Sequence, residues 1–182
     1  MWRDESVTWQ VAHRPLGGIW ELLGQVDAVH GLYYLLMHAV FLVGDGGAAG
    51  AGGGPGAGGL WALRLPSVAA TALAAAGVAA VGHRLAGERA ALWSGAAYAV
   101  LPPVQMYAQE GRSYALVAAA VVWATYLMLR ERWIAYAAAM LVACWLHEFA
   151  VLALLAHGVG ARRCRGSWSG SPCRWPCCRP AC

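Results

Sequence analysis

Four apolar blocks follow one another in the second part of the chain, at residues 66–82, 90–107, 113–129 and 133–158. Short basic or polar joints separate them, and Pro102 and Pro103 interrupt the second block. A helix needs about 20 apolar residues to cross a bilayer, and the shorter blocks reach that length with flanking residues. None shows the polar stripe at helical period that a surface helix of a soluble domain carries. The pattern therefore predicts transmembrane helices.

The basic residues of the joints predict an orientation for these helices. They form three groups, at residues 83–89, 130–132 and 162–165. The positive-inside rule assigns all three groups to the cytoplasm. The joint at 109–113 and the residues before Leu63 then lie outside. Because the third basic group must also be cytoplasmic, we expect the fourth block to be a tight hairpin of two short arms that turns near His147 and Glu148.

The residues before these blocks predict shorter helices. Leu16, Ile19, Trp20 and Leu23 recur at helical spacing, which indicates one apolar face of a helix. The apolar stretch at 31–43 is too short to span, since runs of this length are more often interfacial or re-entrant. We therefore expect residues 6–43 to form amphipathic helices on the membrane surface. The alternative is that 31–43 borrows Gly-rich neighbours and spans the bilayer.

Composition supports a membrane location and divides the chain into three regions. Hydrophobic residues make up 60% of the chain and charged residues 12%, against roughly 25% charged in an ordinary globular protein. We expect an external region at 1–62 that includes a flexible Gly-rich linker at 44–59, transmembrane helices at 63–160, and a tail at 161–182. Fold class is therefore all-α, a polytopic transmembrane bundle with external amphipathic helices.

The tail holds five of the six cysteines, from Cys164 onward. Cys173, Cys177 and Cys178 lack the regular paired spacing of a zinc site. A disulfide knot conflicts with the expected cytoplasmic side, where disulfides are rare. The abrupt end of the hydrophobic pattern favours an out-of-frame or disordered tail, and we predict no function for it.

Polar residues that could carry chemistry gather in the predicted external segments. Asp4 and Glu5 are adjacent carboxylates ahead of an expected helix start at Ser6, where they could cap the helix or accept a proton from an acceptor hydroxyl. His30 precedes two tyrosines that also suit a headgroup-level aromatic belt. Glu110 and Arg112 follow the double proline, and an arginine before a helix N-terminus suits a phosphate. A charged external turn is the alternative there.

Several motifs in order resemble the N-terminal part of the GT-C superfamily of membrane glycosyltransferases. The resemblance is to bacterial protein mannosyltransferase-like and aminoarabinose-transferase-like enzymes of actinobacterial type. It rests on the acidic pair at 4–5, HGLYYLL at 30–36, LRLPSVAATALAAAGVAAVGHRLAG at 63–87 and LPPVQMYAQEGRSYAL at 101–116. It covers residues 2–158. Gly31 stands where the family has prolines, and the family's first span and C-terminal half have no counterpart, so we expect a fragment.

The resemblance implies a transferase that moves a sugar, mannose being one option, from a polyprenyl-phosphate donor to an acceptor hydroxyl on a protein or glycan. Asp4 would be the catalytic base, with Glu5 beside it. Arg112 would bind the donor phosphate, and Glu110, Tyr107 and His30 would line the site. The expected location is the bacterial plasma membrane, as a multi-pass protein.

We predict no metal, no cofactor and no nucleic-acid partner. The alternatives are a fragment of a multi-span transporter and a non-catalytic truncated membrane protein. A transporter favours helices broken in paired internal repeats, and the sequence shows one Pro-broken helix and no repeat.

Overall fold

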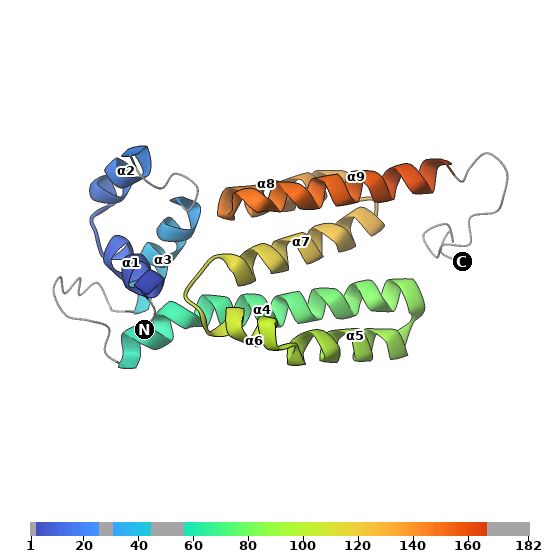
Figure 1. Ribbon diagram of the computed structural model, residues 1–182, viewed down its shortest axis with the longest axis horizontal. Helices are drawn as coiled ribbons and strands as arrows, with labels where there is room; N and C mark the ends of the chain where they lie inside the picture. The colour runs from blue at the N-terminus through green and yellow to red at the C-terminus, as the bar shows by residue number, and fades with distance from the viewer. Residues whose placement is uncertain (1–2, 26–30, 45–56, 167–182) are drawn as a thin grey trace.

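The computed structural model describes residues 3–25, 31–44 and 57–166, and every element in these ranges is a helix (Figure 1). The all-α prediction is therefore confirmed. Helices α1, α2 and α3 form a compact group at one end, and α4 to α9 form an elongated bundle (Figure 1). The bounds are α1 Arg3–Ala12, α2 Leu16–Gln25, α3 Gly31–Gly44, α4 Ala57–Ala86, α5 Glu88–Val100, α6 Pro102–Gln109, α7 Tyr114–Leu129, α8 Trp133–Leu146, a 3₁₀ turn Glu148–Ala150, and α9 Val151–Gly166.

Helix α4 contains a stretch long and apolar enough to cross a membrane, Gly59–Ala86, with 28 residues. A core helix of a soluble protein can have the same length and composition, but its side chains are mostly buried. Only 22% of the most apolar window of α4 is buried. Large side chains on other helices are exposed too, such as Trp93 on α5, Ile134 on α8 and Leu155 on α9. Extensive exposed apolar surface of this kind marks an interaction with a membrane or a partner, which favours membrane association.

The other apolar helices of the described ranges are shorter than a span. They are Gly31–Val43, Tyr114–Leu129, Trp133–Leu146 and Glu148–Gly160. The helix is interrupted at Leu101. This residue has extended backbone, follows the end of α5 and precedes Pro102, the first residue of α6. Proline fixes its own φ and disfavours helical backbone in the residue before it, so the predicted interruption of the second block is confirmed.

The fourth block is a hairpin, as predicted. Helix α8 ends at Leu146, His147 adopts extended backbone, and α9 returns along α8. The His157 ring on α9 bonds the Tyr136 hydroxyl near the start of α8 (3.2 Å) and the Thr125 hydroxyl on α7 (3.0 Å). Side-chain hydrogen bonds of this type hold apolar helices together in membranes. They fix the two short arms of the hairpin against α7.

The three basic groups lie at one end of the bundle. The turn after α4, the turn between α7 and α8, and the C-terminal end of α9 lie at the end opposite to α1, α2 and α3 (Figure 1). The predicted tail differs at its beginning, since residues 161–166 continue α9 as a helix. Residues 167–182 and residues 45–56 of the predicted linker lie outside the described residues, and Ala57 already begins α4.

Helices α4 and α5 pack closely through small residues. A Cβ atom added at Gly95 would lie 3.0 Å from the Ala79 Cβ and 3.3 Å from the Ala75 carbonyl oxygen. Ser94 also donates a hydrogen bond to the Val78 carbonyl (3.4 Å). Small residues that let helix backbones approach are typical of helix pairs in membranes. The Ala-rich composition of α4 therefore serves its packing as well as its apolar character.

Gly95→Val is expected to destabilise the protein by about 1–3 kcal/mol, because overpacking a tight contact forces the helices apart. The measurement is thermal unfolding in detergent, followed by helical circular dichroism. Gly158→Val is the matched control, since a Cβ at Gly158 meets nothing within 4 Å. Equal losses in both variants would show that the α4–α5 contact is loose.

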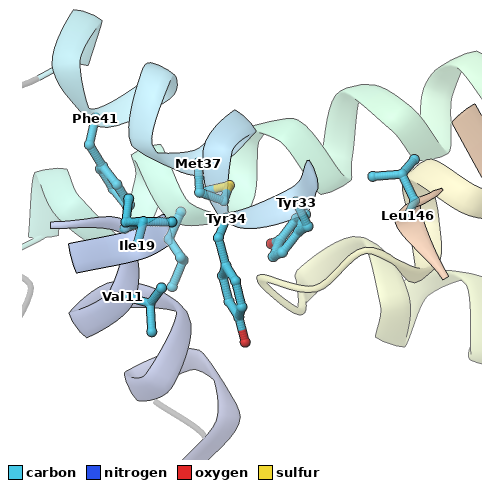
Figure 2. Close-up of a cluster of buried hydrophobic side chains, with 9 residues drawn as sticks. Val11, Ile19, Tyr33, Tyr34, Met37, Phe41 and Leu146 are labelled. Atoms are coloured by element: carbon cyan, nitrogen blue, oxygen red, sulfur yellow. The ribbon is translucent and has the colours of Figure 1, made fainter. Parts of the chain in front are cut away.

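The group formed by α1, α2 and α3 has its own apolar core, continuous with the bundle. Ile19, Met37, Phe41 and Tyr33 are buried together, and Leu63 of α4 and Leu146 of α8 join them. In Figure 2 Phe41 and Met37 of α3 lie near Ile19 of α2, and Leu146 of α8 lies to one side, beyond Tyr33. The short helices are thereby fixed against the end of the bundle.

Two details of this region differ from the sequence prediction. Helix α1 includes Arg3, Asp4 and Glu5 and does not begin at Ser6. In α2 the predicted apolar face divides: Ile19 is buried, whereas Leu16 and Trp20 are 58% and 73% exposed. The side chain of Leu23 lies outside the described part. Exposed Leu16 and Trp20 suit the predicted contact with a membrane surface.

Candidate functional site

A buried carboxylate ties three distant segments together at the end of the bundle. Glu5 is 1% exposed. Arg64 on α4 donates to both of its oxygens, Nε to Oε1 and Nη2 to Oε2, each at 3.2 Å. The backbone N–H of Gly111 donates to Oε1 at 3.3 Å. Bidentate, charge-assisted bonds of this kind are among the strongest in proteins, so Glu5 joins α1 to α4 and to the loop between α6 and α7.

Further contacts fix this α6–α7 loop, residues 110–113. Ser67 on α4 donates to the Arg112 carbonyl at 3.3 Å, and Thr8 on α1 donates to the Gly111 carbonyl at 3.5 Å. The backbone of Gly111 lies very close to the Leu63 side chain, since a Cβ added at Gly111 would lie 2.7 Å from the Leu63 Cγ. The loop can approach α4 this closely only because residue 111 has no side chain. Arg112 is thereby held at a defined place.

Arg112 lies at the edge of an aromatic group. Its Nη1 donates to the Tyr114 hydroxyl at 3.3 Å, and its Cζ is 5.3 Å from the centre of the Tyr114 ring. The Tyr114 ring is also 5.3 Å from Tyr107 and 5.4 Å from His147. An arginine stacked on an aromatic ring keeps its charge. A cation with flat apolar rings beside it can bind a phosphate and the face of a neighbouring sugar ring.

Tyr33 on α3 is buried beside these charges. It is 2% exposed, and its hydroxyl has no hydrogen-bond partner among the described residues. Burial raises the pKa of the Tyr33 hydroxyl well above its usual range, and the charge of Glu5 and the neighbouring Tyr34 raise it further, whereas Arg112 acts in the opposite direction. Tyr33 therefore stays protonated and can donate a hydrogen bond.

Some of the predicted site residues meet and others are not described. Glu5 and Arg112 are brought to one place, because Gly111 next to Arg112 bonds Glu5. Glu110 directly follows α6 and belongs to the same loop, and Tyr107 lies beside Tyr114 with 38% exposure. Asp4 belongs to the first turn of α1, but its side chain lies outside the described part. His30 also lies outside the described residues.

Sequence reasoning missed Arg64, Tyr33 and Ser67 as members of this site. Arg64 had a usable signal, since a lone charge beside an apolar block is expensive in a membrane helix and needs a partner. His147 was noted as an ionisable residue in an apolar block, and the structure brings it to Tyr114. Tyr33 had no such signal, because tyrosine is common at membrane interfaces.

Two other features of the described part bear on ligands. No three His, Cys, Asp or Glu side chains within it gather closely enough to hold a metal ion. A groove of about 540 Å³ lies between α4 and α5, lined mainly by apolar residues with His83 and Glu88. It is near the basic turn after α4, so it is separate from the Glu5 cluster.

Comparisons of the chain with protein-family models, with curated proteins and with solved structures found no match.

Proposed function

We propose that this chain functions as a membrane glycosyltransferase of the GT-C type. The reaction is transfer of a sugar from a polyprenyl-phosphate donor to an acceptor hydroxyl on a protein or glycan, at the extracytoplasmic face. The observation that supports it most is the cluster of Glu5, Arg64, Gly111 and Arg112. Segments that resemble separate motifs of that superfamily meet there in space, although they lie far apart in sequence.

The position of the cluster fits a lipid-linked substrate. It lies where α4 meets the short helices, at the end of the bundle opposite to the three basic groups (Figure 1). By the positive-inside rule the basic end faces the cytoplasm, so the cluster faces outside, as a multi-pass protein of a bacterial plasma membrane requires for this reaction. A polyprenyl tail would remain in the bilayer along the exposed apolar helices, while its phosphate reaches Arg112.

The chemistry follows from the residues. The acceptor oxygen attacks the anomeric carbon of the donor sugar, and the bond from that carbon to the phosphate oxygen breaks. The acceptor proton passes to a carboxylate, for which Asp4 is the candidate, and the polyprenyl phosphate leaves with the electron pair. Arg112 stabilises the charge that develops on the leaving oxygen.

The same location favours a transferase over a transporter. Transporters bind their substrate near the bilayer midplane, at the interface of repeats with broken helices. The cluster of Glu5, Arg64 and Arg112 instead lies at one end of the bundle, next to surface helices.

The function is tested by a transfer assay with the purified chain in lipid nanodiscs. The donor is polyprenyl-phosphate-linked radiolabelled mannose, and the acceptors are membrane proteins and short glycans. Arg112→Gln is expected to reduce the transfer rate about 10²–10³-fold, the usual effect of removing a group that stabilises a developing negative charge.

Arg130→Gln is the matched control for this variant. Arg130 makes the same kind of contact, Nη1 to the Tyr126 hydroxyl at 3.2 Å, but at the opposite end of α7. Its loss is expected to leave transfer unchanged. No transfer by the unmodified chain, or an equal rate in Arg112→Gln, would contradict the proposal.

A further inference from the structure

The hydroxyl of Tyr33 is a buried donor that lacks an acceptor. Its residue is 2% exposed, and no described group accepts its proton. Most buried polar side-chain atoms in proteins have a partner, and leaving one unpaired costs about 1–3 kcal/mol. A phenylalanine would fill the same space without this cost. The hydroxyl therefore calls for an explanation beyond packing.

The surroundings of Tyr33 fix its ring firmly. Met37, one turn further along α3, is fully buried, and Leu63 and Leu146 belong to the same core. In Figure 2 the ring lies on the side of α3 that faces the α6–α7 loop. Because the ring cannot swing out to solvent, an acceptor has to come to the hydroxyl.

Two charged side chains, Glu5 and Arg112, have opposite effects on the Tyr33 hydroxyl. Glu5 lies close enough to disfavour a negative charge on Tyr33, and Arg112 close enough to favour one. Glu5, however, already accepts bonds from Arg64 and Gly111. Glu5 and Tyr34 act on the hydroxyl more strongly than Arg112 does, but the guanidinium of Arg64 offsets the Glu5 charge. An anionic ligand oxygen at the hydroxyl would therefore meet the positive charge of Arg112 and the tyrosine donor.

We propose that the Tyr33 hydroxyl donates a hydrogen bond to an anionic phosphate oxygen of the ligand that Arg112 binds. This inference rests on the proposed function, and it adds a binding residue to the donor site. Tyr33 of α3 and Arg112 of the α6–α7 loop would then bind the same phosphate group. Entry of the phosphate supplies the acceptor that the buried hydroxyl lacks.

The test measures binding separately from catalysis. The probe is undecaprenyl phosphate, titrated into the full chain in nanodiscs of neutral phosphatidylcholine and followed by intrinsic tryptophan fluorescence. Tyr33→Phe is expected to weaken binding about tenfold, as for loss of one hydrogen bond to a charged group. Its melting temperature without ligand should be unchanged or higher, because the variant removes an unpaired buried hydroxyl.

Tyr126→Phe is the matched control. It likewise removes a single tyrosine hydroxyl, here one at the far end of α7 that accepts a bond from Arg130, and it should bind like the unmodified chain. A second arm adds inorganic phosphate as a competitor. Displacement at millimolar concentration from the unmodified chain, and weaker displacement from Tyr33→Phe, would show that Tyr33 recognises the phosphate group. Absence of competition in the unmodified chain would assign recognition to the lipid tail and overturn the inference.

The pH dependence gives an independent readout. Because the pKa of Tyr33 is raised, the hydroxyl remains a donor up to about pH 9.5, below the ordinary tyrosine value of about 10. The ratio of the two affinities, unmodified chain over Tyr33→Phe, should therefore stay constant from pH 6 to about pH 9.5. A ratio that collapses within this range would contradict the donor role.

The outcomes separate this inference from the proposed function. Undecaprenyl phosphate that fails to bind the unmodified chain would overturn both. Tight binding by the unmodified chain with an equal affinity in Tyr33→Phe would overturn only the role of Tyr33. A lower melting temperature in Tyr33→Phe without loss of affinity would show that the hydroxyl serves the fold.

Discussion

Arg64→Leu is expected to lower the free energy of unfolding by about 3–5 kcal/mol, the usual cost of removing one partner of a buried ion pair. Glu5 is 1% exposed and depends on Arg64 for bonds to both oxygens. Without Arg64 its charge would keep only the bond from the Gly111 N–H among these contacts. The α6–α7 loop and the start of α1 are expected to loosen together, because Glu5 connects both to α4.

Removing the other charge of the pair, with Glu5→Gln, should lower the free energy of unfolding much less. Arg64 is 36% exposed on its side chain, so in Glu5→Gln the guanidinium can still reach water, and the glutamine oxygen can still accept from Gly111. In the double variant Glu5→Gln/Arg64→Leu the buried charge is gone, and most of the lost stability should return. Thermal unfolding of the four proteins in detergent measures this cycle. Equal losses in the two single variants, with no recovery in the double one, would mean that Glu5 is solvated.

Much of the helical architecture could be predicted because its causes are local. The break at Leu101 follows from the two prolines after it, and α7 from a continuous apolar run. The hairpin at His147 followed from the charge rule applied to the residues after 158. Within the described ranges one helix is a candidate span, Gly59–Ala86, and it contains the first apolar block at 66–82. The multi-pass arrangement stays a prediction.

The predicted start of α1 at Ser6 was wrong. Ser6 has the side chain of a helix cap, but the helix already includes Arg3, and helix ends are the part of an element that a sequence pattern places least well. The site could be predicted only in part, because its contacts join distant segments. Glu5 and Arg112 were chosen from their residue types, yet the role of Glu5 depends on partners 59 and 106 residues away. Tyr33 is distinguished only by the acceptor that its hydroxyl lacks.

The anchoring of Glu5 leads to a prediction about its neighbour. A carboxylate that already accepts three hydrogen bonds is a poor proton acceptor, because those bonds stabilise its charged form. The two members of the acidic pair should therefore have different tasks, with Glu5 holding the fold and Asp4 serving as base.

Asp4→Asn is expected to reduce the transfer rate about 10²–10⁴-fold, the usual contribution of general base catalysis. Its melting temperature and its affinity for undecaprenyl phosphate should stay close to those of the unmodified chain. Arg64→Leu should show the opposite pattern, a large loss of stability before any specific loss of rate. Glu21→Gln is the acidic control, since Glu21 is exposed on α2, and it should affect neither quantity. A normal transfer rate in Asp4→Asn would assign proton transfer to another group, and a large loss of stability would place Asp4 with Glu5 in the anchor.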